Sequence, residues 1–218
     1  MLLDLGFIFR GIFFGPVVLI LGKIMDNIFC KKEVRILKEG HMDLYKEAED
    51  KIKANLILFS AFLYLFITPL FVNYDQNNKN IEYTKLLGLI FLQNIGYYYA
   101  HYLMHHTFYS IHSFHHRFDR YISSSIAFAV SMEEFLFAYI SPLMIGSCIL
   151  FPNENTFIVA TALIAIFNLI IHTPSFKTDY YPSLFVSPND HLEHHEKKTI
   201  HYAAPIFSMD RILLFLKK

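Results

Sequence analysis

The hydrophobic residues of this chain gather in long runs separated by short polar segments. Four runs are candidates for membrane-spanning helices: residues 55–72, 86–104, 135–151 and 157–171. A helix that crosses the hydrocarbon core of a bilayer needs about 20 mostly apolar residues. The pattern therefore predicts an all-α, polytopic membrane helical bundle with about four spanning helices in two hairpins.

The segments between these runs complete the predicted organisation. Residues 73–85 are polar and rich in Asn, and Pro152-Asn153-Glu154-Asn155 marks a turn between the last two helices. Residues 122–134 are weakly polar, and we expect them at the membrane interface. Residues 1–54 form an N-terminal anchor or interfacial segment, which precedes a membrane domain over residues 55–218.

The N-terminal apolar stretch does not have the pattern of a cleaved signal peptide. Asp4 stands where a basic region would, and Lys31 and Lys32 follow the stretch. Arg10 interrupts the run. This pattern fits either a membrane anchor or an interfacial helix in which the Arg10 side chain extends to the lipid headgroups.

Composition supports the membrane class and excludes others. Hydrophobic residues make up 54% and charged residues 17% of the chain, and 19 basic residues balance 19 acidic ones. No net field would attract nucleic acid. The two cysteines, with no Cys-x-x-Cys motif, exclude a disulfide framework.

The distribution of basic residues predicts the orientation in the membrane. Seven Lys and Arg residues crowd positions 31–54, whereas the loop after the first span holds only Lys79 and Lys85. The positive-inside rule therefore places residues 31–54 in the cytoplasm. Counting crossings from there returns residues 101–120, and later His172 and everything after it, to the same side.

Histidine is the chemical anomaly of the sequence, because most of its 12 copies fall in three segments on this predicted cytoplasmic side. The segments read HYLMHH (residues 101–106), IHSFHH (111–116) and DHLEHH (190–195). Residues at i, i+3 and i+4 share one face of a helix, so each His-x-x-His-His can direct three imidazoles the same way. Two such motifs occur, where chance predicts about 0.04.

A further histidine, His172, ends an apolar helix, where an ionisable group is costly and usually functional. His41 and His201 stand apart from the clusters, and we expect no metal role for them. The predicted metal ligands are His101, His105, His112, His115, His116, His172, His191, His194 and His195.

Imidazole ligands suit zinc, copper, iron and nickel. A closed structural zinc site favours paired cysteines, which are missing, and needs only four ligands. This many histidines suit two metal ions with positions left for oxygen. Iron can activate O2 for attack on an alkyl C–H bond, although the ligand set by itself leaves zinc open.

The motifs His-x-x-x-His, His-x-x-His-His and His-x-x-His-His at the ends of paired spanning helices resemble the fatty-acid-hydroxylase/sterol-desaturase superfamily. The likeness extends from about Gly88 to Leu214. It includes His201-Tyr202-Ala203 and Met209-Asp210-Arg211, which are similar to the family's Asn-Tyr-Gly and Trp-Asp-Arg segments. Acyl-CoA-type desaturases also carry three boxes but place more chain between the first two.

The resemblance implies a membrane hydroxylase domain over residues 55–218 with a histidine-ligated di-iron centre. It further implies O2-dependent hydroxylation, desaturation or methyl oxidation of a lipid or sterol. Electrons would come from an external donor, cytochrome b5 with its reductase or a bacterial ferredoxin. The location would be the endoplasmic reticulum in a eukaryote, with the histidines facing the cytoplasm.

The chain also departs from the family pattern. Asn94 stands where the family has an acidic residue, and Ser131 where it has a histidine. Whether His106 serves in place of the missing ligand stays open, as does a role for Glu134 as a solvated carboxylate or as a partner of a ligand. A catalytically degenerate member and a non-enzymatic membrane metal-binding protein are the alternative readings.

Positive charges beside the boxes raise the question of a docking surface. Arg117, Lys197 and Lys198 could receive an acidic electron donor. Such charges are more often simple positive-inside residues, and we favour that interpretation.

Overall fold

The computed structural model describes residues 5–74, 80–119, 121–178 and 180–216, and within these ranges the chain is helical with no β-strand. The α-helices are α1 (Leu5–Phe29), α2 (Lys31–Gly40), α3 (Met42–Lys53), α4 (Ser60–Phe62), α5 (Tyr83–His106), α6 (Tyr109–His112), α7 (Met132–Glu134), α8 (Ser141–Leu150), α9 (Glu154–Ile171), α10 (Pro188–Lys197) and α11 (Met209–Leu216). Short π- and 3₁₀-segments are η1 (Ala54–Phe59), η2 (Leu63–Ile67), η3 (Thr68–Leu70), η4 (His115–Phe118), η5 (Ser124–Phe128), η6 (Phe135–Ile140) and η7 (Pro174–Phe176).

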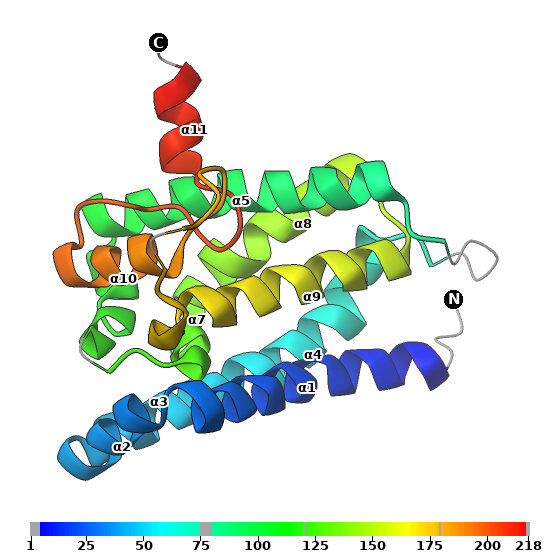
Figure 1. Ribbon diagram of the computed structural model, residues 1–218. Helices are drawn as coiled ribbons and strands as arrows, with labels where there is room; N and C mark the ends of the chain where they lie inside the picture. The colour runs from blue at the N-terminus through cyan, green and yellow to red at the C-terminus, as the bar shows by residue number, and fades with distance from the viewer. Residues whose placement is uncertain (1–4, 75–79, 120, 179, 217–218) are drawn as a thin grey trace.

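Long helical rods run side by side and form the bundle (Figure 1). The elements from α3 to η3 join into one rod over Met42–Leu70, and those from α7 to α8 into another over Met132–Leu150. Together with α1 and α9, they are the four helices of the described chain that are long and apolar enough to cross a membrane. The predicted all-α polytopic bundle is confirmed.

The membership of that set differs from the sequence prediction in two respects: it includes α1, which the sequence leaves open as an anchor or interfacial helix, and it does not include residues 86–104. Residues 86–104 lie in α5, which is 24 residues long but does not meet the same apolar criterion. Its buried face carries polar side chains, among them Gln93, Asn94 and His101. Helix α5 runs beside α8 and α9 (Figure 1). The polar side chains that lower its mean hydropathy are on the face that is buried in the bundle.

The turn between α8 and α9 forms where the sequence predicts it. Phe151 takes a left-handed conformation that ends α8, and Pro152 follows. The side-chain oxygen of Asn153 accepts a hydrogen bond from the backbone N–H of Thr156, at 2.9 Å, and so caps α9. This tight connection returns the chain toward the histidine end of the bundle.

Residues 122–134, which we expect at the membrane interface, begin with a stretch that the protein itself buries. Residues 122–130 are buried, and η5 packs between α1 and α9. Three polar contacts make this burial possible: Asp26 accepts from the Ser125 backbone N–H at 3.1 Å, and Asn55 donates to the carbonyls of Phe128 and Val130 at 3.2 and 3.1 Å. A weakly polar sequence can be buried when other elements supply its hydrogen bonds.

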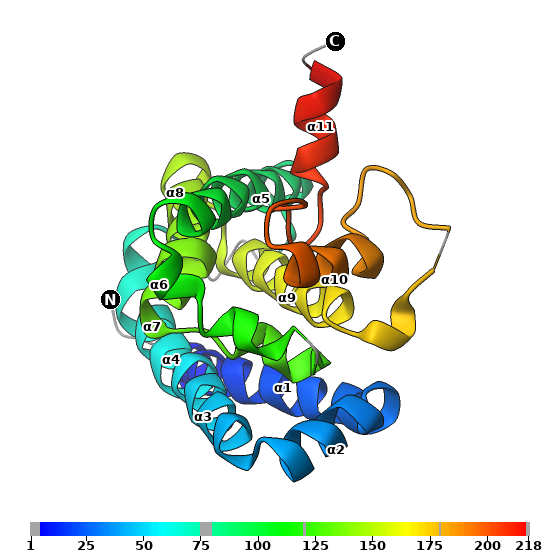
Figure 2. The ribbon, with the colours of Figure 1, turned by 90° about the vertical axis from the view of Figure 1, so that its left-hand side faces the viewer.

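All the histidine-bearing elements lie at one end of the bundle. The C-terminal end of α5, the short helix α6, the segment η4 and helix α10 meet there, as Figure 2 shows when this end faces the viewer. Helix α11 projects away from the bundle on the α5 side. Segments more than 70 residues apart in sequence are thereby brought together.

Small residues allow α1 to approach the Met42–Leu70 rod closely. A Cβ atom built on Gly15 would lie 1.5 Å from the backbone oxygen of Leu56, while one on Gly40 would meet nothing within 4 Å. Close helix contact through small residues is a common way to pack membrane helices.

We predict that Gly15→Ala lowers the free energy of unfolding by about 1–3 kcal/mol, because the backbones must separate to admit the methyl group. Gly40→Ala is the matched control, and we expect no loss from it. Thermal unfolding in detergent checks both. Equal midpoints for the two variants would contradict the packing described here.

Candidate metal centre

Two groups of histidine side chains fill the end of the bundle. Within each group, one ring nitrogen from every residue lies within 4.8 Å of those from the others. The first group contains His101, His105, His112, His116 and His194. The second group contains His115, His172, His191 and His195. The structure thus brings together all nine residues that the sequence singles out.

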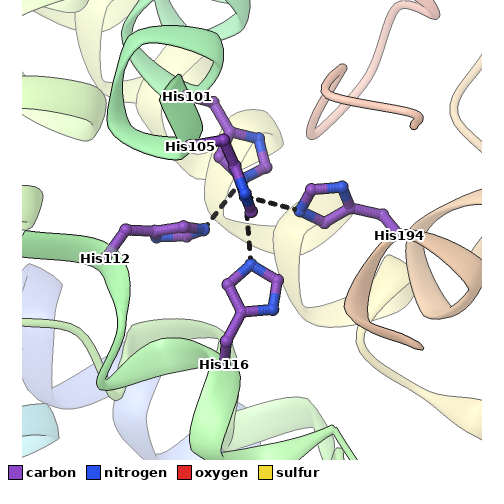
Figure 3. A group of neighbouring side chains, drawn as sticks. All are labelled: His101, His105, His112, His116 and His194. Atoms are coloured by element: carbon purple, nitrogen blue, oxygen red, sulfur yellow. Dashed lines mark hydrogen bonds between the residues drawn. The ribbon is translucent and has the colours of Figure 1, made fainter. Parts of the chain in front are cut away.

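The first group draws on three separate parts of the chain (Figure 3). Helix α5 supplies His101 and His105, one turn apart on the same face, while His112 and His116 come from α6 and η4. His194 reaches in from α10. The Nε2 atoms of His101 and His112 lie 2.9 Å apart, and that of His105 lies 3.1 Å from those of His116 and His194.

Hydrogen bonds on the outer side of the rings determine which nitrogen carries the proton. His101 Nδ1 lies 2.8 Å from the carbonyl oxygen of Tyr202, and His194 Nδ1 lies 2.7 Å from that of Ile200. A carbonyl can only accept, so each neutral ring carries its proton on Nδ1. The Nε2 lone pairs of both rings must then point into the group.

His112 shows the same arrangement with a carboxylate as acceptor. Its Nδ1 lies 2.7 Å from Glu134 Oε1, and both side chains are fully buried. With Nδ1–H donating to Glu134, the Nε2 lone pairs of His112 and His101 face each other at 2.9 Å. Two lone pairs at this distance repel unless a cation lies between them.

The second group repeats this pattern around His172. The carbonyl of Asn168 accepts from His172 Nδ1 at 2.7 Å, so the Nε2 lone pair faces inward. That atom lies 2.9 Å from His191 Nε2 and 3.3 Å from His115 Nε2. His195, at 0% exposure, has no hydrogen-bond partner at either ring nitrogen within the described part of the chain.

Burial keeps these imidazoles neutral. Removal from water lowers the pKa of His191 and His195 well below the usual 6.5, and neighbouring imidazoles add to the effect. The same cause lowers the pKa of His194 to about 3. Metal ligation requires the neutral ring, so the environment favours the binding form at ordinary pH.

Ser131, the residue that replaces an expected histidine, belongs to neither group. Its hydroxyl caps α7 by accepting from the Glu134 backbone N–H and donates to the carbonyl of Ile111, both at 3.0 Å. Ser131 therefore holds the turn that carries Glu134. The question left open for Glu134 is answered by its contact with His112: it is a buried partner of a group member rather than a solvated carboxylate.

The segment after the third histidine motif supports the site from outside. Asp210 accepts hydrogen bonds from the backbone N–H groups of Tyr202 and Ala203, at 3.2 and 2.8 Å. Arg211 Nη2 donates to both carboxylate oxygens of Asp190, at 2.9 and 2.8 Å, at the start of α10. These contacts fix the Tyr202 carbonyl against His101 and anchor the helix that bears His194.

The remaining histidines lie outside both groups. His106 stacks on the ring of Tyr102 and donates from Nδ1 to the Tyr102 carbonyl. His41 hydrogen-bonds the Tyr121 hydroxyl at 2.7 Å, and His201 lies 3.3 Å from a Glu193 oxygen. His41 and His201 are thus apart from the clusters, as the sequence analysis expects, and His106 does not take the place of a missing ligand.

Two buried asparagines, neither of them predicted as a site residue, also shape the site. Asn94 is fully buried, and its oxygen accepts from the backbone N–H groups of Ile206 and Phe207 at 3.0 and 2.8 Å. Asn168 supplies the carbonyl that sets the His172 tautomer. Both are polar residues inside apolar helices, and that signal marks functional positions in membrane proteins.

An apolar cavity lies in the bundle beside the histidine groups. It is lined mainly by aliphatic and aromatic side chains from the long helices, and no charged residue or histidine is among them. Tyr97, which lines it, packs edge-on against the ring of His101 at a centroid distance of 5.3 Å. Asn168 also lines it, one turn before His172. The cavity therefore reaches to within one helical turn of both groups.

The donor set fits metal ions. Inward lone pairs on His101, His194 and His172, together with the unpartnered ring nitrogens of His195, have no other electrophile among the described residues. An unsatisfied buried polar atom costs about 1–3 kcal/mol. A cation in each group would satisfy these atoms and remove the repulsion between them.

Comparison with known proteins agrees with this arrangement. The family model described as fatty acid hydroxylase matches residues 86–214, more than half of the chain. Neither a curated protein nor a solved structure shows significant similarity. The matched region contains both histidine groups and the segment that supports them, and the chain belongs to the fatty acid hydroxylase family.

Proposed function

We propose that the protein is an O2-dependent lipid oxidoreductase whose two histidine groups hold two iron ions. The observation that carries the proposal is the convergence of nine imidazoles, eight of them buried and that of His105 half-buried, into two groups beside an apolar cavity. Family membership supports lipid oxidation as the general activity. The proposal includes the identity of the metal as iron, the number of two ions per chain, and the nine histidines as their ligands.

Bound iron would supply the redox chemistry that activates O2 for attack on an alkyl C–H bond. In a hydroxylation, one oxygen atom enters the lipid as an alcohol and the other leaves as water, with two electrons and two protons from an external donor. In a desaturation, the lipid loses two hydrogen atoms, the external donor again supplies two electrons and two protons, and both oxygen atoms leave as water.

The protein's own contribution is ligation, orientation and exclusion of water. His101, His112, His172 and His194 would be held in the ligating tautomer by their outer hydrogen bonds. The apolar cavity would hold the hydrocarbon part of the substrate with its reacting carbon toward the histidines. The apolar walls would keep water from the reaction.

We further propose that the histidine end faces the cytoplasm, in the endoplasmic reticulum membrane if the organism is eukaryotic. The basic residues of α2 and α3 lie at this end of the bundle, which supports that orientation. Electrons would come from a separate protein such as cytochrome b5 with its reductase, or a ferredoxin. Arg117 pairs with Glu47 and Lys197 with Glu193, so these two charges already have acidic neighbours within the chain.

We expect iron-loaded protein to contain about two iron ions per chain, one for each group. His194→Ala and His195→Ala each remove a ligand from one group and should each reduce iron to about one per chain. His106→Ala is the matched control and should retain two. Metal analysis of purified protein measures this, and comparative lipidomics of cells with and without the gene measures the activity.

An oxidised lipid that disappears with the gene and with His195→Ala, but not with His106→Ala, would support the oxidoreductase. Iron far below one per chain in the wild type, or lipid profiles that none of these changes affects, would support the degenerate or purely metal-binding alternative.

Glu134→Ala should weaken metal binding at the first group by about 10- to 100-fold, since His112 loses the partner that orients its ring. Glu134→Gln retains an acceptor oxygen and should restore much of the affinity. Glu133→Ala, an exposed neighbour, is the control. Metal titration followed by competition with a chelator gives the affinities. An unchanged affinity in Glu134→Ala would show that this carboxylate has no positioning role.

Acid should destabilise the metal-free protein. The pKa values of His191, His194 and His195 in the folded protein lie below the unfolded value of 6.5. Below pH 6.5, the unfolded chain therefore binds protons at these histidines while the folded protein does not. Stability is therefore full above pH 6.5 and falls as the pH drops toward the folded values. Each such histidine contributes about 1.4 kcal/mol per pH unit in that window. Thermal unfolding in detergent at several pH values tests this, and a midpoint that does not change between pH 7 and 5 would contradict it.

A further inference from the structure

The apolar cavity is lined by a buried glutamine, Gln93, for whose amide nitrogen the described residues provide no hydrogen-bond acceptor. Gln93 lies on α5, two turns before His101, and lines the cavity. It is only 1% exposed. Its side-chain oxygen accepts a hydrogen bond from Asn94 Nδ2 at 3.2 Å, while its amide nitrogen has no partner among the described residues.

The orientation of the Gln93 amide follows from its neighbour. Asn94 Oδ1 accepts from two backbone N–H groups, those of Ile206 and Phe207, so the oxygen end of that amide is fixed. The NH2 end of Asn94 must then donate, to the Ile90 carbonyl at 2.7 Å and to Gln93 Oε1. The oxygen of Gln93 therefore faces Asn94, and its NH2 group remains as a free donor.

Three other polar side chains that line the cavity, Ser60, Thr161 and Tyr64, already use their donors. Ser60 donates to the Leu56 carbonyl, and Thr161 donates to the Phe157 carbonyl at 2.8 Å. The Tyr64 hydroxyl donates to Glu154, which also forms a two-pronged ion pair with Arg10. A ligand oxygen that accepts from Gln93 would therefore use a donor to which the protein itself provides no acceptor.

The charge of the cavity restricts the ligand. No charged side chain lines it, and the charges of Arg10 and Glu154 beside Tyr64 neutralise each other. A carboxylate or phosphate buried here would lack a counter-ion, which is strongly unfavourable. An uncharged oxygen, in a hydroxyl or carbonyl group, can accept from Gln93 without that cost.

We propose that Gln93 is a specificity-determining residue that binds an uncharged hydroxyl or carbonyl oxygen of the lipid substrate inside the cavity. The inference rests on the proposed function only in taking the cavity as the substrate site. With a rise of 1.5 Å per residue, the eight residues from Gln93 to His101 span about 12 Å. The bound oxygen would thus hold the reacting carbon about 12 Å away, beside the histidines.

Binding to the purified full-length chain in detergent tests this assignment without requiring turnover. Tritiated hexadecan-1-ol is the bound probe, and hexadecane, hexadecan-1-ol, hexadecanoate and cholesterol are the competitors. We expect the alcohol to compete about two- to tenfold better than the alkane, the range for one added hydrogen bond. Hexadecanoate should compete less well than the alcohol. The cholesterol arm shows whether the oxygen belongs to a sterol or to a linear chain.

Gln93→Met keeps a similar shape but removes the donor, and it should make alcohol and alkane compete equally. Thr161→Val is the matched control, because it removes a cavity hydroxyl whose donor is already used, and it should keep the alcohol preference. Thermal unfolding shows whether each variant is folded. If Gln93→Met does not fold, Gln93→Leu is used in its place.

A preference for alcohol that survives in folded Gln93→Met or Gln93→Leu would overturn the assignment, as would a wild type that prefers hexadecanoate or treats alcohol and alkane alike. A failure of the proposed function would give a different result. Protein that shows the Gln93-dependent preference but binds no iron and oxidises no lipid would keep the lipid site and lose the oxygenase.

Discussion

The arrangement of this end of the bundle depends on one electrostatic constraint: lone pairs of buried, neutral imidazoles face one another at close range. The Nε2 atoms of His101 and His112, and those of His172 and His191, both lie 2.9 Å apart. Backbone carbonyls on the outer side fix the protons of His101 and His172 away from the centre. A cation in each group would remove this repulsion, so metal binding and folding would be coupled at this end of the protein.

Much of the surrounding structure serves to hold those outer acceptors in place. Asp210 fixes the loop whose Tyr202 carbonyl receives the His101 proton, Ser131 caps the turn that carries Glu134, and Asn94 ties residues 206–207 to α5. The two positions at which the sequence departs from the family pattern are thus structural in this chain. The departures do not remove a member of either histidine group.

The sequence predicts the histidine groups well because imidazole spacing on a helix is a local property, and charge counting brings the segments to one membrane side. It predicts less where burial depends on distant partners. The sequence of residues 122–130 does not reveal that Asp26 and Asn55, on other helices, supply the hydrogen bonds that allow its burial. The division of nine histidines into five and four also depends on tertiary packing. His115 and His116 are adjacent in sequence and yet belong to different groups.

The central claim is that each histidine group holds one metal ion. Anomalous diffraction from crystals of iron-loaded protein, recorded at the iron absorption edge, tests it most directly. The account predicts two peaks, one among His101, His105, His112, His116 and His194, and the other among His115, His172, His191 and His195. A single peak, no peak, or peaks at other residues would contradict it.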